Sequence, residues 1–382
     1  MNFVGIYADT PAELNCSTYN IFDPCNAFNK AGHNAKYFHI NEFVANGPEV
    51  QKTISECDLL MIERNLFQDC LTILQFWKVR NKIIMIIFDD SYHQILKDNV
   101  SFPFWTKGEI NYKDQEGKDQ IGYMKPPPIE QLAWGISMSA GLQTVSQQLA
   151  DDWSHLNDTY IINNHIVLEN YMNIEPLIKH DKDTILIGWS GSLSHLNSWT
   201  TSGALNSLKF VVRKYPQVKI LTSGDKRVFD AIPVPKDRKM FQPFVPAEQY
   251  KSLVKSFDIY MIPLNGEYDK RRSWIKAIEC CALKVPWIAS DYPTYNNCKQ
   301  YGHVTENGSK NWTEAISNAI ENLIQYREFA NEVAYPFALT QDIDLHVDER
   351  IGLYKHVIEK GYRREQKPEL SILSFNQLPK KE

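Results

Sequence analysis

The sequence has no long hydrophobic run and no marked excess of one charge, and we do not expect its first residues to be a signal peptide. Its longest apolar run, Ile83–Phe88, has the length of a buried strand and is far shorter than the ~18–20 residues that cross a bilayer. The N-terminal residues MNFVGIYADT lack the basic flank and the apolar core of a secretory signal. With 41 basic and 46 acidic residues, the chain is not expected to be a protein that mainly coats nucleic acid. This overall balance still allows a local basic strip on one face.

The cysteines are too few for a disulfide scaffold and show no metal-binding pattern. Their number is odd, and their spacing contains neither a C-x-x-C motif nor a zinc signature. We therefore expect reduced, mostly buried thiols in a cytoplasmic protein, without a structural zinc. The seven are Cys16, Cys25, Cys57, Cys70, Cys280, Cys281 and Cys298.

The chain is long and apolar enough for two hydrophobic cores. Its 382 residues exceed the ~250–300 at which a single core stops growing. With 43% hydrophobic and 12% aromatic residues, it is neither a disordered nor a fibrous chain.

Short apolar strands alternate with helical stretches in both halves, a pattern typical of βαβ units and parallel sheets. In the first half the strands are predicted at Asn2–Tyr7, Lys36–Ile40, Leu59–Ile62, Lys82–Phe88, Gln143–Val145 and Thr159–Ile162. In the second half they are predicted at Thr184–Trp189, Val218–Thr222, Asp258–Pro263 and Val285–Ala289. The main helices between them are predicted at Tyr19–Lys30, Ile129–Ser139, Thr201–Tyr215, Ala247–Phe257, Arg272–Leu283 and Trp312–Tyr326.

A charged linker, Lys179–Asp183, separates the two patterns. We therefore predict an α/β protein with two Rossmann-like domains, at residues 1–178 and 179–340. Residues 341–382 then form a C-terminal part, with an amphipathic helix at Asp342–Gly361 and a polar, frayed tail beyond Arg363. The polar and aromatic segment Phe102–Lys125 is predicted to be an irregular loop over a functional edge.

The most informative stretch runs from Asp258 to Tyr295. Ligands of open parallel sheets bind beyond the carboxyl ends of strands, and with two such domains the natural site is the cleft between them. Arg272, Lys276 and Glu279 are spaced to share one helix face behind such a strand. Ser273 and the first amides of that helix would attract an anion, which suits a nucleotide diphosphate, and the inner carboxylate would suit its ribose. The alternative is an exposed helix with a surface ion pair.

This stretch resembles the C-terminal signature of GT-B glycosyltransferases of the retaining, glycogen-synthase-like superfamily. The resemblance implies two Rossmann-like domains facing a cleft, a nucleotide-diphosphate sugar as donor, and a last helix that crosses back to the N-terminal domain. It also implies that the later glutamate binds the donor ribose and that the helix start faces the diphosphate. The matching residues are Pro263, Arg272, Ser273, Lys276, Glu279, Ala282, Pro286, Ser290 and Tyr295.

One position departs from that signature. Relatives carry a glutamate eight residues before the ribose-binding one, where it contacts the sugar, and this chain has Arg271 there. Glu267 or Asp269 in the same loop could replace it.

Further segments follow in the order that the resemblance implies. Ile187–Ser198 is similar to the Gly-rich turn that brings amides to the phosphates, with Gly191 and Ser192 in place and His195 where many relatives have Lys or Arg. The loop FQPFVP, which contains Phe244, is expected to border the base.

In the N-terminal half, Asp89, Asp90 and His93 follow a buried strand and resemble the segment that relatives present near the reacting sugar. We predict that these three are the catalytic residues. The alternative is an aspartate that caps the next helix. Two adjacent carboxylates without a third ligand are a weak metal signal, so no metal site is predicted.

The resulting expectation is a glycosyltransferase that moves a sugar from a nucleotide-diphosphate sugar to an acceptor hydroxyl with retention of configuration, without a required cofactor. The acceptor is left open among a glycan, a lipid-linked sugar, a small molecule and a hydroxymethylated DNA base, which some phage enzymes of this fold glucosylate. The alternatives are a GT-B sugar-nucleotide epimerase, a phosphorylase, and a non-catalytic protein that binds nucleotides or glycans.

Overall fold

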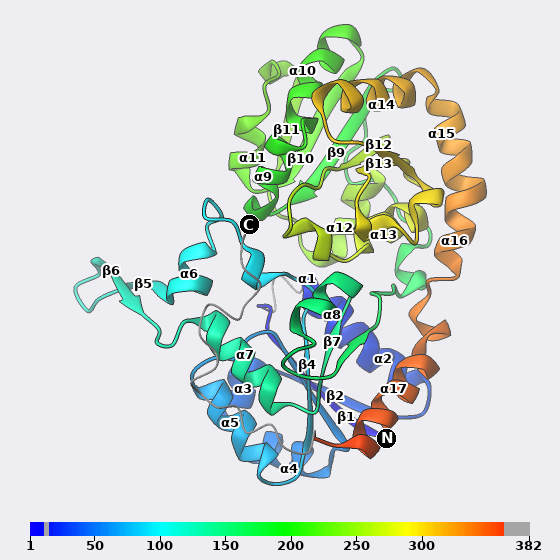
Figure 1. Cartoon of the computed structure of the whole chain (residues 1–382). Coiled ribbons are helices and arrows are strands. Elements are labelled where there is room, and N and C mark those ends of the chain that lie inside the picture. The colour runs from blue at the N-terminus through cyan, green and yellow to red at the C-terminus, as the bar shows by residue number, and fades with distance from the viewer. Residues whose placement is uncertain (11–14, 363–382) are drawn as a thin grey trace. The chain divides into compact units, whose positions relative to one another are not determined.

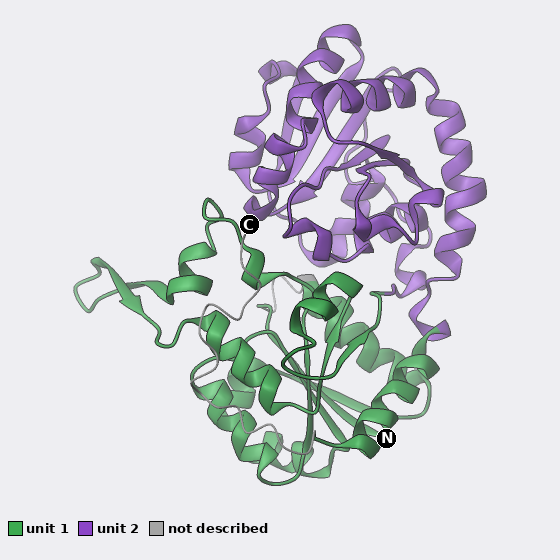
Figure 2. Ribbon diagram, viewed as in Figure 1, with its two compact units in different colours: residues 1–164, 346–382 green, residues 165–345 purple. Residues whose placement is uncertain are grey.

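The computed structural model describes residues 1–10 and 15–362, which form two compact units (Figures 1 and 2). Unit 1 contains Met1–Asn164 and the C-terminal segment from His346, and unit 2 contains His165–Leu345. Each unit is built on its own parallel sheet of six strands, flanked by helices. The α/β class with two Rossmann-like domains is therefore confirmed.

The sheet of unit 1 has the order β2-β1-β3-β4-β7-β8. Its central strands β3 and β4 are buried except at Ile83, because helices cover both faces and apolar residues follow one another without alternation. The strands are β1 Asn2–Tyr7, β2 Asn34–His39, β3 Leu59–Glu63, β4 Ile83–Ile87, β7 Gly141–Thr144 and β8 Thr159–Ile161. The helices are α1 Asn15–Ser17, α2 Asp23–Lys30, α3 Ile40–Ala45, α4 Pro48–Glu56, α5 Asp69–Lys78, α6 Phe102–Lys107, α7 Pro128–Met138, α8 Gln147–Trp153 and α17 Val347–Lys360.

The last helix, α17, belongs to unit 1, as the resemblance implied. Its Tyr354 is fully buried and stacks on Phe3 of β1, with ring centroids 5.6 Å apart. The Tyr354 hydroxyl donates to the side-chain oxygen of Gln143, at 2.8 Å. The predicted tail beyond Arg363 lies outside the described residues.

The segment predicted as an irregular loop, Phe102–Lys125, is regular. It contains helix α6 and an antiparallel hairpin of β5 (Glu109–Lys113) and β6 (Asp119–Tyr123). The loop prediction was wrong: apolar residues recur at every second position in both strands, at Ile110 and Tyr112 and at Ile121 and Tyr123, which is typical of a strand. The strands are short and mostly exposed, so this pattern was missed.

The sheet of unit 2 has the order β11-β10-β9-β12-β13-β14. Its strands are β9 Ile185–Gly191, β10 Val218–Gly224, β11 Lys239–Gln242, β12 Ile259–Ile262, β13 Trp287–Ser290 and β14 His303–Thr305. Its helices are α9 Leu196–Thr201, α10 Ala204–Lys214, α11 Lys226–Ala231, α12 Ala247–Lys255, α13 Ile275–Leu283, α14 Ser309–Glu321, α15 Leu323–Phe329 and α16 Tyr335–Leu339. The core lies under α10 and α14, around Trp189, Trp199 and Trp312.

The units divide the chain at 164/165 and 345/346, whereas the sequence pattern placed the domain boundaries near 178 and 340. Residues 165–178 therefore belong to unit 2 and not to unit 1. Within them, Tyr171 is buried and its hydroxyl donates a hydrogen bond to Glu279 of the same unit.

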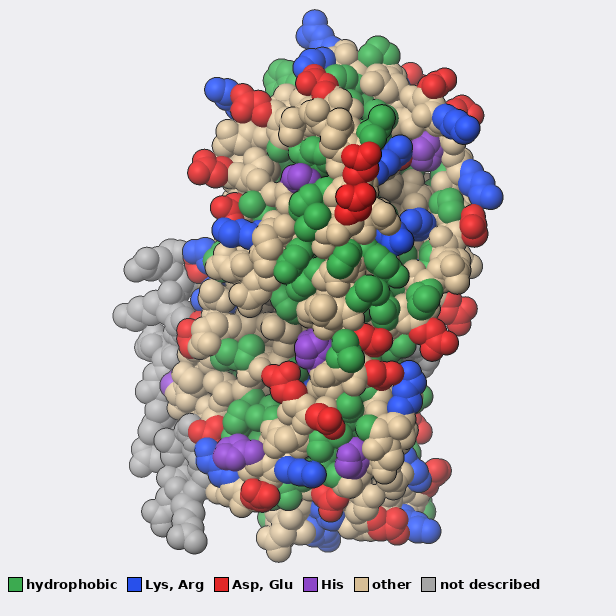
Figure 3. Space-filling model, turned by 90° about the vertical axis from the view of Figure 1, so that its right-hand side faces the viewer, with side chains coloured by type: hydrophobic (Ala, Val, Ile, Leu, Met, Phe, Trp, Pro, Cys, Tyr) green, Lys and Arg blue, Asp and Glu red, His purple; other side chains and the backbone are tan. Residues whose placement is uncertain are grey.

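The cysteines and the charged side chains are arranged as the composition leads us to expect. All seven cysteines are free thiols and six are buried, as predicted. On the face drawn in Figure 3, basic side chains are interspersed with acidic and apolar ones. No helix within the described parts of the chain is long and apolar enough to span a membrane.

Candidate active site

Each sheet has one point at which the order of its strands reverses. In unit 2 the chain runs from β9 outward through β10 to β11, and then returns to β12 on the other side of β9. In unit 1 the reversal lies between β1 and β3. Loops leave such a point in opposite directions, which opens a crevice at the carboxyl ends of the strands. The candidate residues of both units lie at these ends.

In unit 2, the backbones after β9 and β10 approach each other closely. Gly224 has φ +114°, and a Cβ there would meet the carbonyl oxygen of Gly191 at 2.1 Å. A Cβ on Gly191 would in turn meet the rings of Trp189 and His195. Both positions therefore require glycine, and together they keep the end of β9 free of side chains.

The predicted base-contacting residue lies beside the same glycine. Phe244 is 63% exposed, and its ring edge lies 3.2 Å from where a Cβ of Gly224 would stand. The structure thus brings Phe244 next to the Gly191 turn, with a ring face available for stacking.

Lys276 on α13 reaches the end of β9. Its Nζ donates to the backbone carbonyl of Ser190 at 2.5 Å, and the Ser190 hydroxyl lies 2.8 Å from the hydroxyl of Tyr260. The ammonium group is thereby fixed at the carboxyl end of the strand.

His195 lies beside this ammonium group and is 7% exposed. Burial lowers the pKa of its imidazole well below the ordinary value, and the positive charges of Arg272 and Lys276 lower it further. His195 is therefore neutral at pH 7, and the positive charge of the site comes from the other two residues. By the resemblance, His195 stands where many relatives have Lys or Arg, and in the structure the charges of Arg272 and Lys276 act on this imidazole.

Asp269 organises the loop after β12. It is 1% exposed and accepts hydrogen bonds from Ser198 Oγ at 2.5 Å, the Asn265 amide at 2.8 Å and Arg272 Nε at 2.6 Å. Arg271 instead donates to the carboxylate of the exposed Glu267, at 2.9 Å. The two arginines therefore have different carboxylate partners.

The predicted start of the helix at Arg272 was wrong. Helix α13 begins at Ile275, and the backbone of Arg272 is extended, with φ −71° and ψ 163°. Arg272 therefore shares no helix face with Lys276 and Glu279, although its charge still acts on the same imidazole. Ser273 Oγ accepts from the amide of Ile275, at 3.3 Å, so its hydroxyl lies at the helix start as predicted.

Glu279, one turn further along α13, is 3% exposed. Its Oε1 accepts a hydrogen bond from the hydroxyl of Tyr171 at 3.0 Å. This contact fixes the orientation of the carboxylate inside unit 2.

At the reversal point of unit 1, sequence reasoning missed a buried acidic network centred on Glu63, the last residue of β3. The side chain is fully buried and accepts from Ser17 Oγ at 2.5 Å, Asn20 Nδ2 at 3.1 Å and Arg64 Nη1 at 2.7 Å. Arg64 also forms an ion pair with Asp9, which follows β1 in the chain. A carboxylate at the end of an otherwise apolar strand was the one sequence signal for this network.

Asp89 follows β4 and faces the same network. It is 8% exposed, and its Oδ1 has no hydrogen-bond partner among the described residues. Burial and the neighbouring Asp90 raise the pKa of Asp89 to about 7, while a hydrogen bond from Cys16 opposes the rise. A carboxyl group with such a pKa exchanges protons at neutral pH.

His93 lies in the short 3-10 turn Tyr92–Gln94, where its Nε2 lies 2.8 Å from Asp152 Oδ2 on α8. The residue that precedes this turn is Ser91, and it makes no side-chain capping bond. The N-cap position of this turn is therefore held by Ser91 and not by an aspartate.

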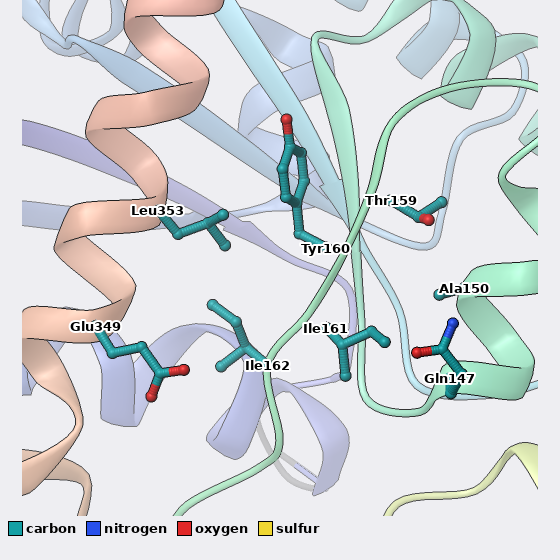
Figure 4. Close-up of a pocket in the computed structure, with 8 residues that line it drawn as sticks. All are labelled: Gln147, Ala150, Thr159, Tyr160, Ile161, Ile162, Glu349 and Leu353. Atoms are coloured by element: carbon teal, nitrogen blue, oxygen red, sulfur yellow. The ribbon is translucent and has the colours of Figure 1, made fainter.

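A separate pocket of about 450 Å³ opens on unit 1 between β8, α8 and α17 (Figure 4). Polar Gln147 and Glu349 and apolar Ile161 and Leu353 line it. None of the predicted site residues contributes to it. Among the described residues, no group of three or more His, Cys, Asp or Glu side chains could hold a metal ion.

No family model matches the chain, and no curated protein matches its sequence. Solved structures match its fold over nearly the full length. An alpha-glucosyltransferase in complex with UDP-glucose and DNA containing an abasic site has a TM-score of 0.62 at 11% identity, with 92% of this chain and 99% of that chain covered.

HepE from Anabaena, in complex with UDP and glucose, has a TM-score of 0.60 at 12% identity, covering 93% of this chain and 100% of that chain. A putative UDP-N-acetylglucosamine 2-epimerase from Listeria monocytogenes has a TM-score of 0.55 at 10% identity, covering 95% and 99%. At such identities the likeness concerns the fold, which hosts more than one reaction. The chain therefore has the GT-B fold, and the resemblance seen in its sequence is confirmed at the level of the fold.

Proposed function

We propose that this protein is a glycosyltransferase that transfers a sugar, a hexose in the simplest case, from a nucleotide-diphosphate sugar to an acceptor hydroxyl with retention of configuration. The observation that carries the proposal is the cationic end of β9. There the positive charges of Arg272 and Lys276 act on the neutral His195, beside a turn that its glycines keep open. Such a site suits a diphosphate, which gains negative charge as the glycosidic bond breaks.

Each donor-side residue then has a role. Arg272, Lys276 and the amides near Gly191, Ser192 and Ser273 bind the diphosphate, and Arg271 adds positive charge behind them. His195 supplies a neutral hydrogen-bonding group beside the phosphates. Glu279 accepts the ribose hydroxyls, and Phe244 stacks on the base.

The acceptor-side residues are Asp89, Asp90 and His93. Asp89 would take up or release a proton as the acceptor hydroxyl reacts, because its pKa of about 7 matches the working pH. His93, held by Asp152, would orient the reacting groups. The mechanism needs no metal and no cofactor besides the donor substrate.

The rival functions differ in what they release. An epimerase would convert a sugar nucleotide without an acceptor, a phosphorylase would require inorganic phosphate, and a binding protein would release no nucleotide. The acceptor classes are a glycan, a lipid-linked sugar, a small molecule and a hydroxymethylated base in DNA. A base in DNA is included because one structure of similar fold, the alpha-glucosyltransferase, is a complex with DNA.

The test has two stages. Thermal-shift screening against UDP, GDP, ADP, CMP and their sugars identifies the donor, since a ligand that binds only the folded state raises the Tm. Nucleotide release is then measured with that donor and each acceptor class, with EDTA as a control. Acceptor-dependent release that EDTA leaves unchanged supports the proposal. Binding without release, or conversion of the donor alone, would refute it.

A further inference from the structure

The hairpin β5–β6 stands off the remainder of unit 1 as a two-stranded ribbon (Figure 1). An isolated hairpin is marginally stable in water, and three or more strands are normally needed. Its strands nevertheless expose large side chains: Tyr112 is 52% exposed, Ile121 55% and Tyr123 59%. The ribbon therefore carries apolar surface that pairing with a further strand would cover in part.

The base and the tip of the hairpin are both well defined. At the base, Trp105 is buried and stacks on Tyr92 with ring centroids 4.0 Å apart. At the tip, Asp114 Oδ1 accepts from the amides of Glu116 and Lys118, each at 2.9 Å. The free edge of β5 is thus held in a fixed shape.

The hydrogen bonds that frame the ribbon show which groups of β5 face outward. The Met124 amide donates to Gly108 at 2.7 Å, and the Asp114 amide donates to Lys118 at 3.0 Å. Bonded pairs alternate along an antiparallel ladder, so residues 110 and 112 also bond inward to β6. The N–H and C=O groups of Glu109, Asn111 and Lys113 therefore point away from β6, and no described strand pairs with them.

The sequence of β5, Glu-Ile-Asn-Tyr-Lys, is complementary to itself when one copy runs antiparallel to another about Asn111. In this register Glu109 lies opposite Lys113 of the second copy, and Ile110 lies opposite Tyr112. Lys113 also lies 3.4 Å from Asp119 of its own hairpin, and both side chains are exposed. The outward backbone groups of residues 109, 111 and 113 then face their counterparts in hydrogen-bonding position. Opposite-charge and apolar cross-strand pairs both stabilise a sheet.

We propose that two copies of this chain associate through β5, forming a symmetric four-stranded sheet of order β6-β5-β5-β6. The contact is isologous, because each copy contributes the same strand to a twofold axis at Asn111. Its small size places it among weak, reversible interfaces. It is independent of the proposed enzymatic function.

The charges of β5 provide a test by sedimentation velocity from low micromolar to several hundred micromolar protein. The wild type should dimerise as the concentration rises. Glu109→Lys should place two lysines opposite each other and Lys113→Glu two glutamates, so each variant alone should be a monomer. An equimolar mixture of the two should form a heterodimer, and the double variant Glu109→Lys/Lys113→Glu should dimerise again.

The backbone provides a second test. Asn111→Pro removes an outward N–H that β6 does not use and should abolish the dimer, whereas Asn111→Ala keeps this donor and should retain it. Circular dichroism and the Tm of each variant check that the hairpin stays folded. A wild type that remains monomeric throughout would overturn the proposal. So would a dimer that persists in both single charge variants, or a mixture that associates no better than its components.

Discussion

The two units share one architecture, but the charged groups at their reversal points have opposite signs. At the reversal point of unit 2 the charges that act on His195 are positive, from Arg272 and Lys276. At that of unit 1 the buried groups are mainly carboxylates, of which Glu63 is satisfied by hydrogen bonds and Asp89 has a raised pKa. A cationic crevice stabilises a leaving anion, and a buried acid moves protons. In the proposed reaction, unit 2 would bind the departing group and unit 1 would transfer the proton.

The largest effect is expected from Asp89→Asn. It removes the proton-exchanging group with little change in shape, and general acid–base catalysis contributes about 10²–10⁴-fold to a rate. Turnover at saturating donor should fall by roughly that factor, while donor affinity stays near that of the wild type.

Asp90→Asn and His93→Ala should lower turnover in the same selective way, and Asp98→Asn, at an exposed position of unit 1, is the matched control. Normal turnover in all three site variants would remove this segment from the reaction.

The second effect concerns the cations of unit 2. Arg272→Glu or Lys276→Glu should weaken binding of the nucleoside diphosphate by more than the ~10–150-fold that corresponds to one charged hydrogen bond. Binding of the free nucleoside should change little, because it carries no phosphate. Calorimetry with both ligands separates the two. Lys209→Glu, on the exposed side of α10, controls for net charge. Equal losses for both ligands would indicate a folding defect.

A smaller effect is expected at Glu279. Glu279→Ala should weaken donor binding by roughly 10–150-fold, since it deletes a carboxylate acceptor for the ribose. Tyr171→Phe removes only the hydroxyl that holds this carboxylate and should cost less. Measurement with the ribose and the 2′-deoxyribose forms of the same nucleotide should show discrimination that the alanine variant loses. An alanine variant that is folded and still discriminates would exclude Glu279 from ribose contact.

The smallest effect is a pH dependence of stability. The pKa of Asp89 is about 7 in the folded chain and near 4 when unfolded, so the folded state holds a proton that the unfolded chain releases. The associated stability is fully present below about pH 4 and is lost as pH rises towards about 7. Asp89→Asn should therefore raise the Tm relative to wild type more at pH 8 than at pH 4. An unchanged difference between the two pH values would contradict the raised pKa.

Strands and motifs that depend on neighbouring residues could be predicted from the sequence. Conformations that depend on contacts between residues far apart in the chain could not. Continuous apolar runs such as Ile83–Phe88 marked the buried strands, and the signature around Lys276 marked the end of β12. The exposed β5–β6 hairpin has apolar residues at alternate positions, but its strands have only five residues each and are otherwise polar, so the segment resembled a loop. The start of α13 was misplaced because Arg272 is held in an extended conformation next to Asp269, a partner that the spacing does not reveal.

The same limit applies to the site of unit 1. Glu63 draws its hydrogen bonds from Ser17 and Asn20, more than forty positions earlier in the chain. Such a network appears only when the strands are assembled. The position of Asp89 could be predicted, but the rise of its pKa depends on burial that the sequence does not show.

The return of α17 to unit 1 has a consequence for the order in which the molecule can form during synthesis. Unit 2 is one continuous stretch, and the passages at its two ends lie side by side, with the amide of Ile343 donating to Ile166 at 2.8 Å. Tyr354 of α17 packs on Phe3 and bonds to Gln143 in the core of unit 1. Because α17 follows unit 2 in the chain, these contacts can form only after all of unit 2 has been synthesised.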